Sequence, residues 1–571
     1  MRATHQAADN TRAAAVRAVF RGLRDRNQKT NEQSASAGAN RSDVIPPNQV
    51  SKRTGIQESR DHRHGYSRRQ VRWKVATLTA GKSFTFPGGR GKPDDTPWHA
   101  LTHEELFMSD KHVEKAFQLS ASHRALMARD AESVLGWRYE PRIIFTRGKG
   151  VKIYDVDNHE YYDMSGGMMS LLLGHAHPEL VDTIKTMAEQ FVHQSSWYTN
   201  PWAIEFAELI ASTLPGDLKM VNFAVTGSEA NEVAMRMALG ATGGFEICSV
   251  VRGLHGGSLA AEAVTTVGGG RKRGLGPLTM PARSNIIVPP FYYRAPVRDA
   301  DEWDRISLQM TADMLEYTTS QEIAGIIVEP MMVAGGMIVP SQRWLRGLRE
   351  LADRWGALLI FDEAQLAPGR TGKLWGFQHY DVLPDIVTFA KGMTAGFATC
   401  GTVTTPKIAS AARGKKGIPW SGTYPQDPLA CAVALKQLQI VLRDKLTEHA
   451  ENVGRHLQQG LLGLQQRHEC IGDVRGRGLY HMLDIVADPE TREPDHAMAE
   501  RIRYYALLEG LVLICVKNYI RICPPIITTQ SEIDDIVGRL GVALTRAGQG
   551  APAQTDYRKT GSLAADDLRR A

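Results

Sequence analysis

The chain has 571 residues, of which 43% are hydrophobic and 23% charged, so it is long enough for two or more globular domains. Its net charge of +6 is uneven: residues 1–70 hold 14 basic and 6 acidic residues (net +8), and the remainder holds 54 and 56 (net −2). A near-neutral body argues against a nucleic-acid groove. No uninterrupted apolar run reaches about 18 residues, so no membrane-spanning helix is expected.

Residues 1–95 are rich in Arg, Gln, Asn, Ser and Gly, which predicts a basic, largely disordered extension. Within it, Ala13–Leu23 places its apolar residues on one helical face among arginines. Three interpretations stay open for the extension: a loose tail with a marginal helix, an organelle transit peptide, or residues added by an upstream start codon. The six cysteines fit no zinc or disulfide spacing, so we expect a reducing compartment and a cytoplasmic protein.

An ordered body is expected from about residue 96 onward. Residues 96–165 are assigned to the N-terminal segment of a small domain, with a hairpin formed by Val151–Val156 and Tyr161–Met164. Residues 166–430 alternate helical stretches with short apolar strands, which predicts an α/β domain with a largely parallel sheet. Its predicted strands are Met220–Val225, Ile247–Val251, Ile323–Val328, Leu358–Phe361, Ile386–Phe389 and Gly401–Thr404.

The pattern changes after about residue 430. Residues 431–546 begin with a long helix and continue as a mixed segment, which predicts the C-terminal part of a smaller α+β domain. Residues 547–571 are expected to form a flexible tail.

The first motif with chemical content, Thr226–Glu232, follows a predicted strand and opens a predicted helix, Glu229–Leu239. Gly227 and Ser228 would then present free backbone N–H groups at a helix N-terminus, which is a binding site for phosphate. The plain structural alternative is a capping box with Ser228 as the N-cap, and the two interpretations are compatible.

Two charged residues follow buried strands farther along the chain. Asp362 comes after Leu358–Phe361, and ligands of open α/β sheets bind at the carboxyl ends of strands; a helix-capping or loop acid is the alternative. Lys391 follows Ile386–Phe389, where desolvation would lower the pKa of the amine and make it nucleophilic; a solvated loop lysine is the alternative. Together the motifs offer an anion cup for a phosphate, an acid for a ring nitrogen and an amine for an aldehyde.

These segments carry a resemblance to a known family. Thr226–Glu232, Asp362–Gly372 and Phe389–Gly392 resemble the class III aminotransferases, which are pyridoxal 5′-phosphate enzymes of fold type I. The resemblance covers residues 110–545, and Cys470–Gly478 in particular is similar to the 2,2-dialkylglycine decarboxylases of that family. It implies a large domain whose mainly parallel sheet lies between helices, and a smaller α+β domain built from N- and C-terminal segments.

The resemblance also implies roles for residues that match the family's motifs. Lys391 would carry the cofactor as a Schiff base, and Asp362 would pair with the pyridinium nitrogen. Gly227 and Ser228 would hold the phosphate, and Gln365 would contact the phenolic oxygen.

Further matches concern the substrate and a second subunit. Arg521 would clamp the substrate carboxylate, and Glu329 matches an acid that pairs with this arginine in some members. Thr423 would reach the phosphate from a neighbouring subunit, which implies a homodimer or dimer of dimers with shared active sites. The expected partners are a small amino donor and a keto-acid acceptor, with neither nucleic acid nor membrane.

Two departures from the family pattern affect the expected chemistry. Leu254, before His255 at the cofactor, stands where the family has an aromatic residue, so ring stacking of about 0.5–1.5 kcal/mol is lost. Met168 stands where the decarboxylases have a glutamine that helps to hold a scissile carboxylate. His175 and His177 resemble a metal pair but lack a third ligand, so no metal site is expected.

We therefore expect a ping-pong aminotransferase that works through Lys391. Decarboxylation-dependent transamination, or a lyase or mutase reaction on the same scaffold, is the alternative within the family. A non-catalytic cofactor-binding regulator with a basic DNA-binding arm is the alternative from another class, and the pairing of Lys391 with Asp362 argues against it.

Overall fold

The computed structural model describes residues 117–135, 139, 142–272, 275–276, 287–416 and 422–549. All of them belong to one compact unit, Pro97–Ala571. The predicted disordered extension, its Ala13–Leu23 helix and the tail from residue 550 lie outside the described residues. Within those ranges, no helix has the length and apolar content needed to cross a membrane.

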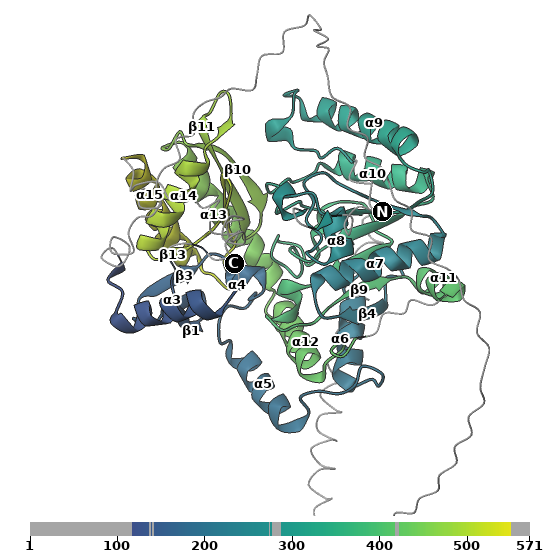
Figure 1. The fold of residues 1–571 in the computed structure, drawn as a ribbon, viewed down its shortest axis with the longest axis horizontal. Coiled ribbons are helices and arrows are strands. Elements are labelled where there is room, and N and C mark those ends of the chain that lie inside the picture. Colours follow the sequence, from purple (N-terminus) through teal and green to yellow (C-terminus); the bar gives the residue numbers. More distant parts are fainter. Residues whose placement is uncertain are drawn as a thin grey trace, which may run out of the picture. The chain divides into compact units, whose positions relative to one another are not determined.

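A six-stranded sheet forms the centre of the larger domain in the described part of the chain (Figure 1). Its order is β4-β9-β8-β7-β6-β5; the run from β5 to β8 is parallel, and β9 is antiparallel to both neighbours. The predicted α/β sheet is therefore confirmed, with one reversed strand. The strands are β4 (Met220–Ala224), β5 (Glu246–Ser249), β6 (Ile323–Val328), β7 (Leu358–Asp362), β8 (Ile386–Phe389) and β9 (Cys400–Thr404).

Helices cover both faces of this sheet. α7 (Gly227–Thr242) packs its buried apolar residues on one face, and α6, α10 and α12 contribute to the core on the other. Burial on both faces explains why β6 is apolar throughout and why Thr388 is the one polar residue of β8. Besides α7, the α-helices of this region are α4 (Gly166–Met169), α5 (Pro178–Gln190), α6 (Pro201–Ser212), α8 (Leu259–Val264), α9 (Ala300–Thr318), α10 (Gln342–Arg354), α11 (Pro406–Lys416) and α12 (Pro428–Arg443). Its short 3₁₀ helices are η1 (Gly269–Lys272), η3 (Tyr292–Arg294), η4 (Gly376–His379) and η5 (Lys391–Thr394).

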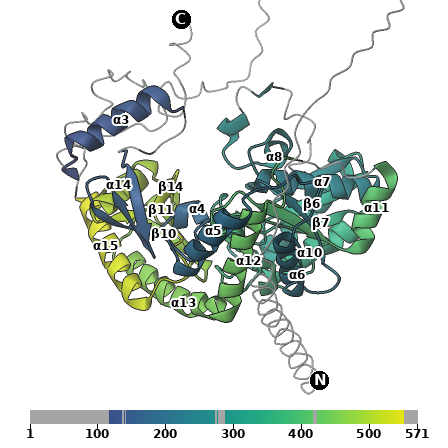
Figure 2. The same ribbon diagram turned by 90° about the horizontal axis from the view of Figure 1, so that it is seen from below.

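The smaller domain has a sheet of order β10-β11-β15-β14, with β12 paired to β11. Figure 2 shows α13 and α15 side by side along these strands. The elements are α13 (Leu446–Gln465), β10 (Ile471–Arg477), β11 (Tyr480–Asp488), β12 (Glu493–Pro494), α14 (His496–Leu508), β14 (Ile514–Val516), β15 (Tyr519–Ile522) and α15 (Gln530–Gly548). The single long helix predicted after residue 430 was wrong: α12 and α13 are separate because Lys445 adopts a left-handed conformation (φ 52°) between them.

A third sheet in the described part of the chain joins segments that are distant in the sequence. The predicted hairpin is confirmed as β2 (Lys152–Asp155) and β3 (Glu160–Asp163), and β1 (Phe145–Lys149), which was not predicted, adds to its edge. On the other side, β3 pairs in parallel with β13 (Leu511–Val512). α3 (Ala121–Ser133) precedes these strands, and the hydrophobic core beside them mixes residues from both ends of the described chain.

Candidate active site

Asp362, the last residue of β7, is buried (3% exposed) and held by four hydrogen bonds. Its Oδ2 accepts from Nδ1 of His255 (2.9 Å) and Nδ2 of Asn231 (2.8 Å). Its Oδ1 accepts from the backbone N–H of Ala364 (3.0 Å) and the hydroxyl of Thr388 (3.3 Å). Burial raises the pKa of Asp362, but the hydrogen bond and charge of His255, the N–H of Ala364 and the charge of Lys391 outweigh burial and lower it. The site therefore holds a permanent negative charge at the carboxyl end of the sheet.

Lys391 begins η5, two residues after β8 ends, with a left-handed backbone (φ 42°). Its side chain is partly accessible, and burial of the amine is the largest influence on its pKa, which is lowered. Asp362 and Glu329 oppose this shift, whereas Arg521 adds to it. The structure thus brings four predicted site residues close enough to interact electrostatically, and it gives Lys391 the environment of a reactive amine rather than a solvated one.

The N-terminus of α7 lies against the same strand ends. A Cβ atom added at Gly227 would lie 3.2 Å from Cβ of Ala390 and 3.8 Å from Cβ of Ala364, the neighbours of the catalytic candidates. The N-cap is Thr226, whose hydroxyl accepts from the N–H of Glu229, so the alternative with Ser228 as N-cap was wrong. Gly227 and Ser228 instead occupy the first turn, where backbone N–H groups have no partner within the helix.

A loop from β5 closes against this turn. The Ser228 hydroxyl accepts from the N–H of Gly257 (3.0 Å), and a Cβ at Gly256 would lie 2.3 Å from Ser228 Oγ. Only glycine permits this close approach, with φ 142° at Gly256. The loop also carries Leu254, which is partly buried, and His255, which is fully buried, into the site.

Glu329 lies directly after β6 and is 2% exposed. Its carboxylate accepts from Nε2 of Gln365 (3.0 Å) and from the backbone N–H groups of Leu254 (3.0 Å) and Val333 (3.3 Å). Burial raises the pKa of Glu329 to about 7, His255 lowers it and Asp362 raises it. The described residues contain no ion pair between Glu329 and Arg521; Glu329 orients Gln365 and the Leu254 loop instead.

Arg521, on β15, supplies the opposite wall of the site. It is 6% exposed, and its Nε is buried without a hydrogen-bond partner among the described residues. Its strand is fixed by register with Met482 of β11 and Ile514 of β14. A buried guanidinium with an unsatisfied donor is costly, so this position favours binding of an anion.

Two predicted residues lie apart from this cluster. Met168 has a left-handed backbone (φ 60°) within α4 and is 53% exposed. Thr423 is exposed in the segment before α12. In the described part of the chain, neither makes a hydrogen bond to the other candidate residues, so their proposed contacts depend on a substrate or a second subunit.

Sequence analysis missed two polar residues that support Asp362. Asn231 donates to Asp362 and to the carbonyl of His255 (2.7 Å), and its own carbonyl accepts from the Thr388 hydroxyl (2.8 Å). Asn231 lies one turn after Gly227 on α7, and Thr388 alternates with core residues of β8. A polar residue in an otherwise buried strand was the available signal.

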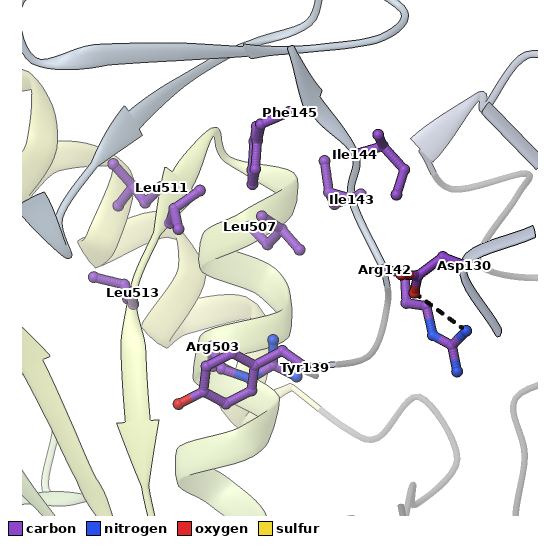
Figure 3. A pocket seen from close by; sticks show the side chains of 11 residues that line it. Asp130, Tyr139, Arg142, Ile143, Ile144, Phe145, Arg503, Leu507, Leu511 and Leu513 are labelled. Carbon is purple, nitrogen blue, oxygen red and sulfur yellow. Dashed lines mark ion pairs between the residues drawn. The ribbon is translucent and has the colours of Figure 1, made fainter. Parts of the chain in front are cut away.

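A separate cavity of about 340 Å³ lies in the smaller domain (Figure 3). Apolar side chains of β1, α14 and β13 line it, including Phe145, Leu507 and Leu511. None of the candidate site residues lines this cavity, so it is distinct from the cluster around Lys391.

Comparison with known proteins identifies the family. The profile of the aminotransferase class-III family matches residues 136–544. The chain belongs to the class-III aminotransferases. It is therefore a pyridoxal-phosphate-dependent transaminase, and its solved neighbours share fold type I.

Individual relatives of this class-III aminotransferase differ in the substrates that they are named for. It is 31% identical to the "Probable 4-aminobutyrate aminotransferase" of Bacillus subtilis, over 71% of this chain and 93% of the relative. It is also 31% identical to the taurine–pyruvate aminotransferase of Bilophila wadsworthia, over 72% and 94%. Among solved structures, a PLP-bound amine transaminase from an uncultivated Pseudomonas species has a TM-score of 0.69 and 30% identity, over 73% and 98%.

Proposed function

We propose that this transaminase holds pyridoxal phosphate between Lys391, Asp362 and the first turn of α7. The observation that carries the proposal is the amine of Lys391, with its lowered pKa, beside an ionised buried carboxylate at neighbouring strand ends. Nε2 of His255 and Oε1 of Gln365 are buried and have no hydrogen-bond partner within the described ranges, which leaves hydrogen-bonding capacity for a polar ring. The donor set therefore fits a phosphate, a basic ring nitrogen and an aldehyde.

When bound, the cofactor supplies an electron-sink ring that weakens the bonds at the α-carbon of an amino acid. Asp362 contributes a fixed negative charge for the ring nitrogen, because its hydrogen bonds keep it ionised. An ion pair at about 4 Å and an effective dielectric of about 20 contributes about 4 kcal/mol, or about three pKa units. This is enough to keep that nitrogen protonated at neutral pH.

The protein's own groups then bind the substrate and move one proton. Arg521 binds the carboxylate of the amino donor through its guanidinium. The amine of Lys391, whose pKa is lowered by burial, would take up the α-proton of the donor and release it again later in the transfer. The donor would leave as a keto product while its amino group stays in the site, and a keto-acid acceptor would then bind to the same Arg521 and take up that group, which gives the ping-pong order. Glu329 holds Gln365 and the Leu254 loop in position throughout.

Borohydride reduction followed by peptide mapping tests the assignment of Lys391 without relying on turnover. The cofactor label is expected on the peptide that contains Lys391, and Lys391→Ala should lose the label, the visible absorbance and activity by about 10⁴-fold. Lys517→Ala is the matched control, because Lys517 is an exposed lysine that also has a left-handed backbone (φ 58°). A label on any other lysine would refute the assignment.

We do not extend the proposal to decarboxylation, because the thioether of Met168 cannot hold a scissile carboxylate as an amide does. The resemblance to 2,2-dialkylglycine decarboxylases, strongest at Cys470–Gly478, is what favours it. Incubation with 2-aminoisobutyrate and pyruvate separates the two reactions. CO₂ release at the rate of keto-acid consumption would overturn our choice.

We further propose that a second copy of the chain completes the site through Thr423. Exposed aromatic residues gather near it, because hydrogen bonds from Gln426 to the carbonyls of Ser196 (2.7 Å) and Tyr198 (3.2 Å) tie the two segments together. The exposed aromatic residues are Trp197, Tyr198 and Tyr424. An apolar patch of this kind is typical of an interface between copies.

Complementation between two inactive variants tests the shared site. Lys391→Ala and Thr423→Ala should each be impaired as homodimers. When co-expressed, one of the two sites in the mixed dimer regains both Lys391 and Thr423, so activity should reappear. Mixing two separately assembled homodimers without exchange is the control. Failure of the mixed dimer to recover activity, or a monomer by light scattering, contradicts the proposal.

A further inference from the structure

A polar cavity of about 550 Å³ lies between the two domains and does not include the candidate active-site residues. One wall comes from the large domain, from Lys373 and from His379 at the end of η4. The other wall comes from α13 and β10 of the small domain, including Arg455 and Arg477. The cavity therefore brings basic side chains of two domains to one space.

Two of the arginines in this cavity are already compensated. Arg475 donates to Asp473 (2.7 Å) and to the buried Asp484 (2.8 Å). Arg455 lies 4.0 Å from Glu451, one turn earlier on α13. These two arginines therefore add little to the charge of the cavity.

Lys373 and Arg477 are different, because neither has an acidic partner within ion-pair distance among the described residues. The Arg477 guanidinium lies over the ring of Tyr380, at 5.6 Å from its centroid, and its Nε is buried without a hydrogen-bond partner in the part of the chain that the structure describes. A buried, unsatisfied guanidinium nitrogen is costly unless an acceptor reaches it.

His379 does not offset these two charges. Its Nε2 is held by the carbonyl of Thr371 at 3.0 Å. Burial, and then the charges of Arg477 and Lys373, lower the pKa of His379 to about 4, so the ring is neutral at physiological pH. The cavity consequently carries two uncompensated positive charges, one from each domain.

We propose that this cavity binds a small dianion, held between Lys373 of the large domain and Arg477 of the small domain. The planar fork of arginine suits the oxygens of a phosphate or a carboxylate, and lysine supplies a point charge from the opposite wall. Glu451 also lines the cavity and lies beside Arg455, but the basic side chains of the lining outnumber it, and an excess of one sign of charge raises the local concentration of counter-ions. The bound anion joins the two domains at a point outside the catalytic cluster.

Calorimetric titration of the full chain, saturated with pyridoxal phosphate, tests this site. Inorganic phosphate and succinate are titrated separately, with ionic strength held constant by chloride. One saturable site per chain is expected for at least one of the two anions. The anion that binds shows whether the site prefers a phosphate or a dicarboxylate. Absence of saturable binding of both anions overturns the proposal.

Variants locate the bound anion. Lys373→Gln and Arg477→Gln should each weaken binding by about tenfold or more, as expected for loss of a charge-assisted hydrogen bond. Lys185→Gln, at an exposed lysine of α5, is the matched control and should leave affinity unchanged. If Arg477→Gln fails to fold, the affinity of Lys373→Gln for the anion tests the site by itself, because Lys373 is exposed.

Arg521→Gln separates this cavity from the active site. Its affinity for the anion should equal that of the unmodified protein. Loss of binding in Arg521→Gln, or unchanged binding in Lys373→Gln, would place the anion at the substrate position and overturn the proposal.

Discussion

The two walls of the active site differ in how far their polar groups are satisfied. Asp362 receives hydrogen bonds from His255, Asn231, Ala364 and Thr388, whereas Nε of Arg521 is buried and has no hydrogen-bond partner among the residues that the structure describes. The Asp362 wall is therefore preorganised before any ligand binds, as an electrostatic site requires. On the Arg521 wall, the N–H at Nε is still available to donate a hydrogen bond to a bound anion. The hydrogen bonds of the charged group are therefore complete where the cofactor is proposed to bind, and incomplete where substrates exchange.

Removing the fixed charge should have the largest effect. Asp362→Asn keeps the shape of the side chain but loses its negative charge. We expect kcat to fall by about 10³-fold, because the ion pair raises the pKa of the ring nitrogen by about three units. Steady-state kinetics and the pH dependence of the cofactor spectrum measure this. Asp385→Asn is the control, because Asp385 precedes the neighbouring strand β8 at its other end and pairs with Arg349 (2.7 Å). Equal losses in both variants would count against a special role for Asp362.

Changing the open wall should affect one class of substrate. Arg521→Gln removes a charged donor, so KM for keto-acid acceptors should rise by about 10- to 100-fold, as expected for a charge-assisted hydrogen bond. Aldehyde acceptors, which lack the carboxylate, serve as the internal control and should retain their kcat/KM. A uniform loss across both acceptor classes would mean that Arg521 supports the fold rather than the substrate.

Glu329 lies between the two walls and predicts a pH dependence of stability. Its pKa is about 7 in the folded protein and 4.5 ordinarily, so the folded state retains a proton that the unfolded chain releases across this window. The contribution of Glu329 to the free energy of unfolding is therefore full below pH 4.5 and is lost as pH rises through 7.

In the apoprotein, Glu329→Gln should gain stability relative to the unmodified chain between pH 5 and pH 8, by up to about 3 kcal/mol. Urea unfolding at a series of pH values measures the difference. Glu302→Gln, at an exposed position of α9, is the control and should show no such trend. A difference that stays flat with pH would contradict a raised pKa at Glu329.

The smallest effect is expected at Leu254. Leu254→Phe restores an aromatic side chain beside the proposed cofactor ring, which should tighten cofactor binding by about tenfold or less, equivalent to about 0.5–1.5 kcal/mol of stacking. Cofactor dissociation followed by absorbance is the measurement. Leu259→Phe, at an exposed position in α8, is the control. Weaker binding in Leu254→Phe would indicate that the loop has no room for a ring.

The sequence predicted those parts of the site that depend on local pattern. The bounds of β6 and β8 were predicted correctly, because each is a short, mostly apolar run buried on both faces. Lys391 and Asp362 followed from their positions after such strands. The support that Asn231 and Thr388 give to Asp362 could not be predicted, because it joins residues 131 and 26 positions away from Asp362.

The break between α12 and α13 was missed for a different reason. Helical periodicity continues through the junction, and only the left-handed backbone of Lys445 separates the two helices. A lysine gives little signal of that conformation, unlike glycine or asparagine. Tertiary packing decides both long-range contacts and the backbone conformation of a single residue such as Lys445.

The parallel pairing of β3 with β13 constrains how the chain can be shortened or synthesised. Tyr162 lies opposite Leu511, so a strand near the start of the described chain obtains its neighbour only after about 350 further residues have been translated. Until then β3 is an open edge, available to other extended chains. Fragments that end before Leu511, which also lack Arg521, should therefore aggregate, and such deletions should reduce yield long before they reach Lys391.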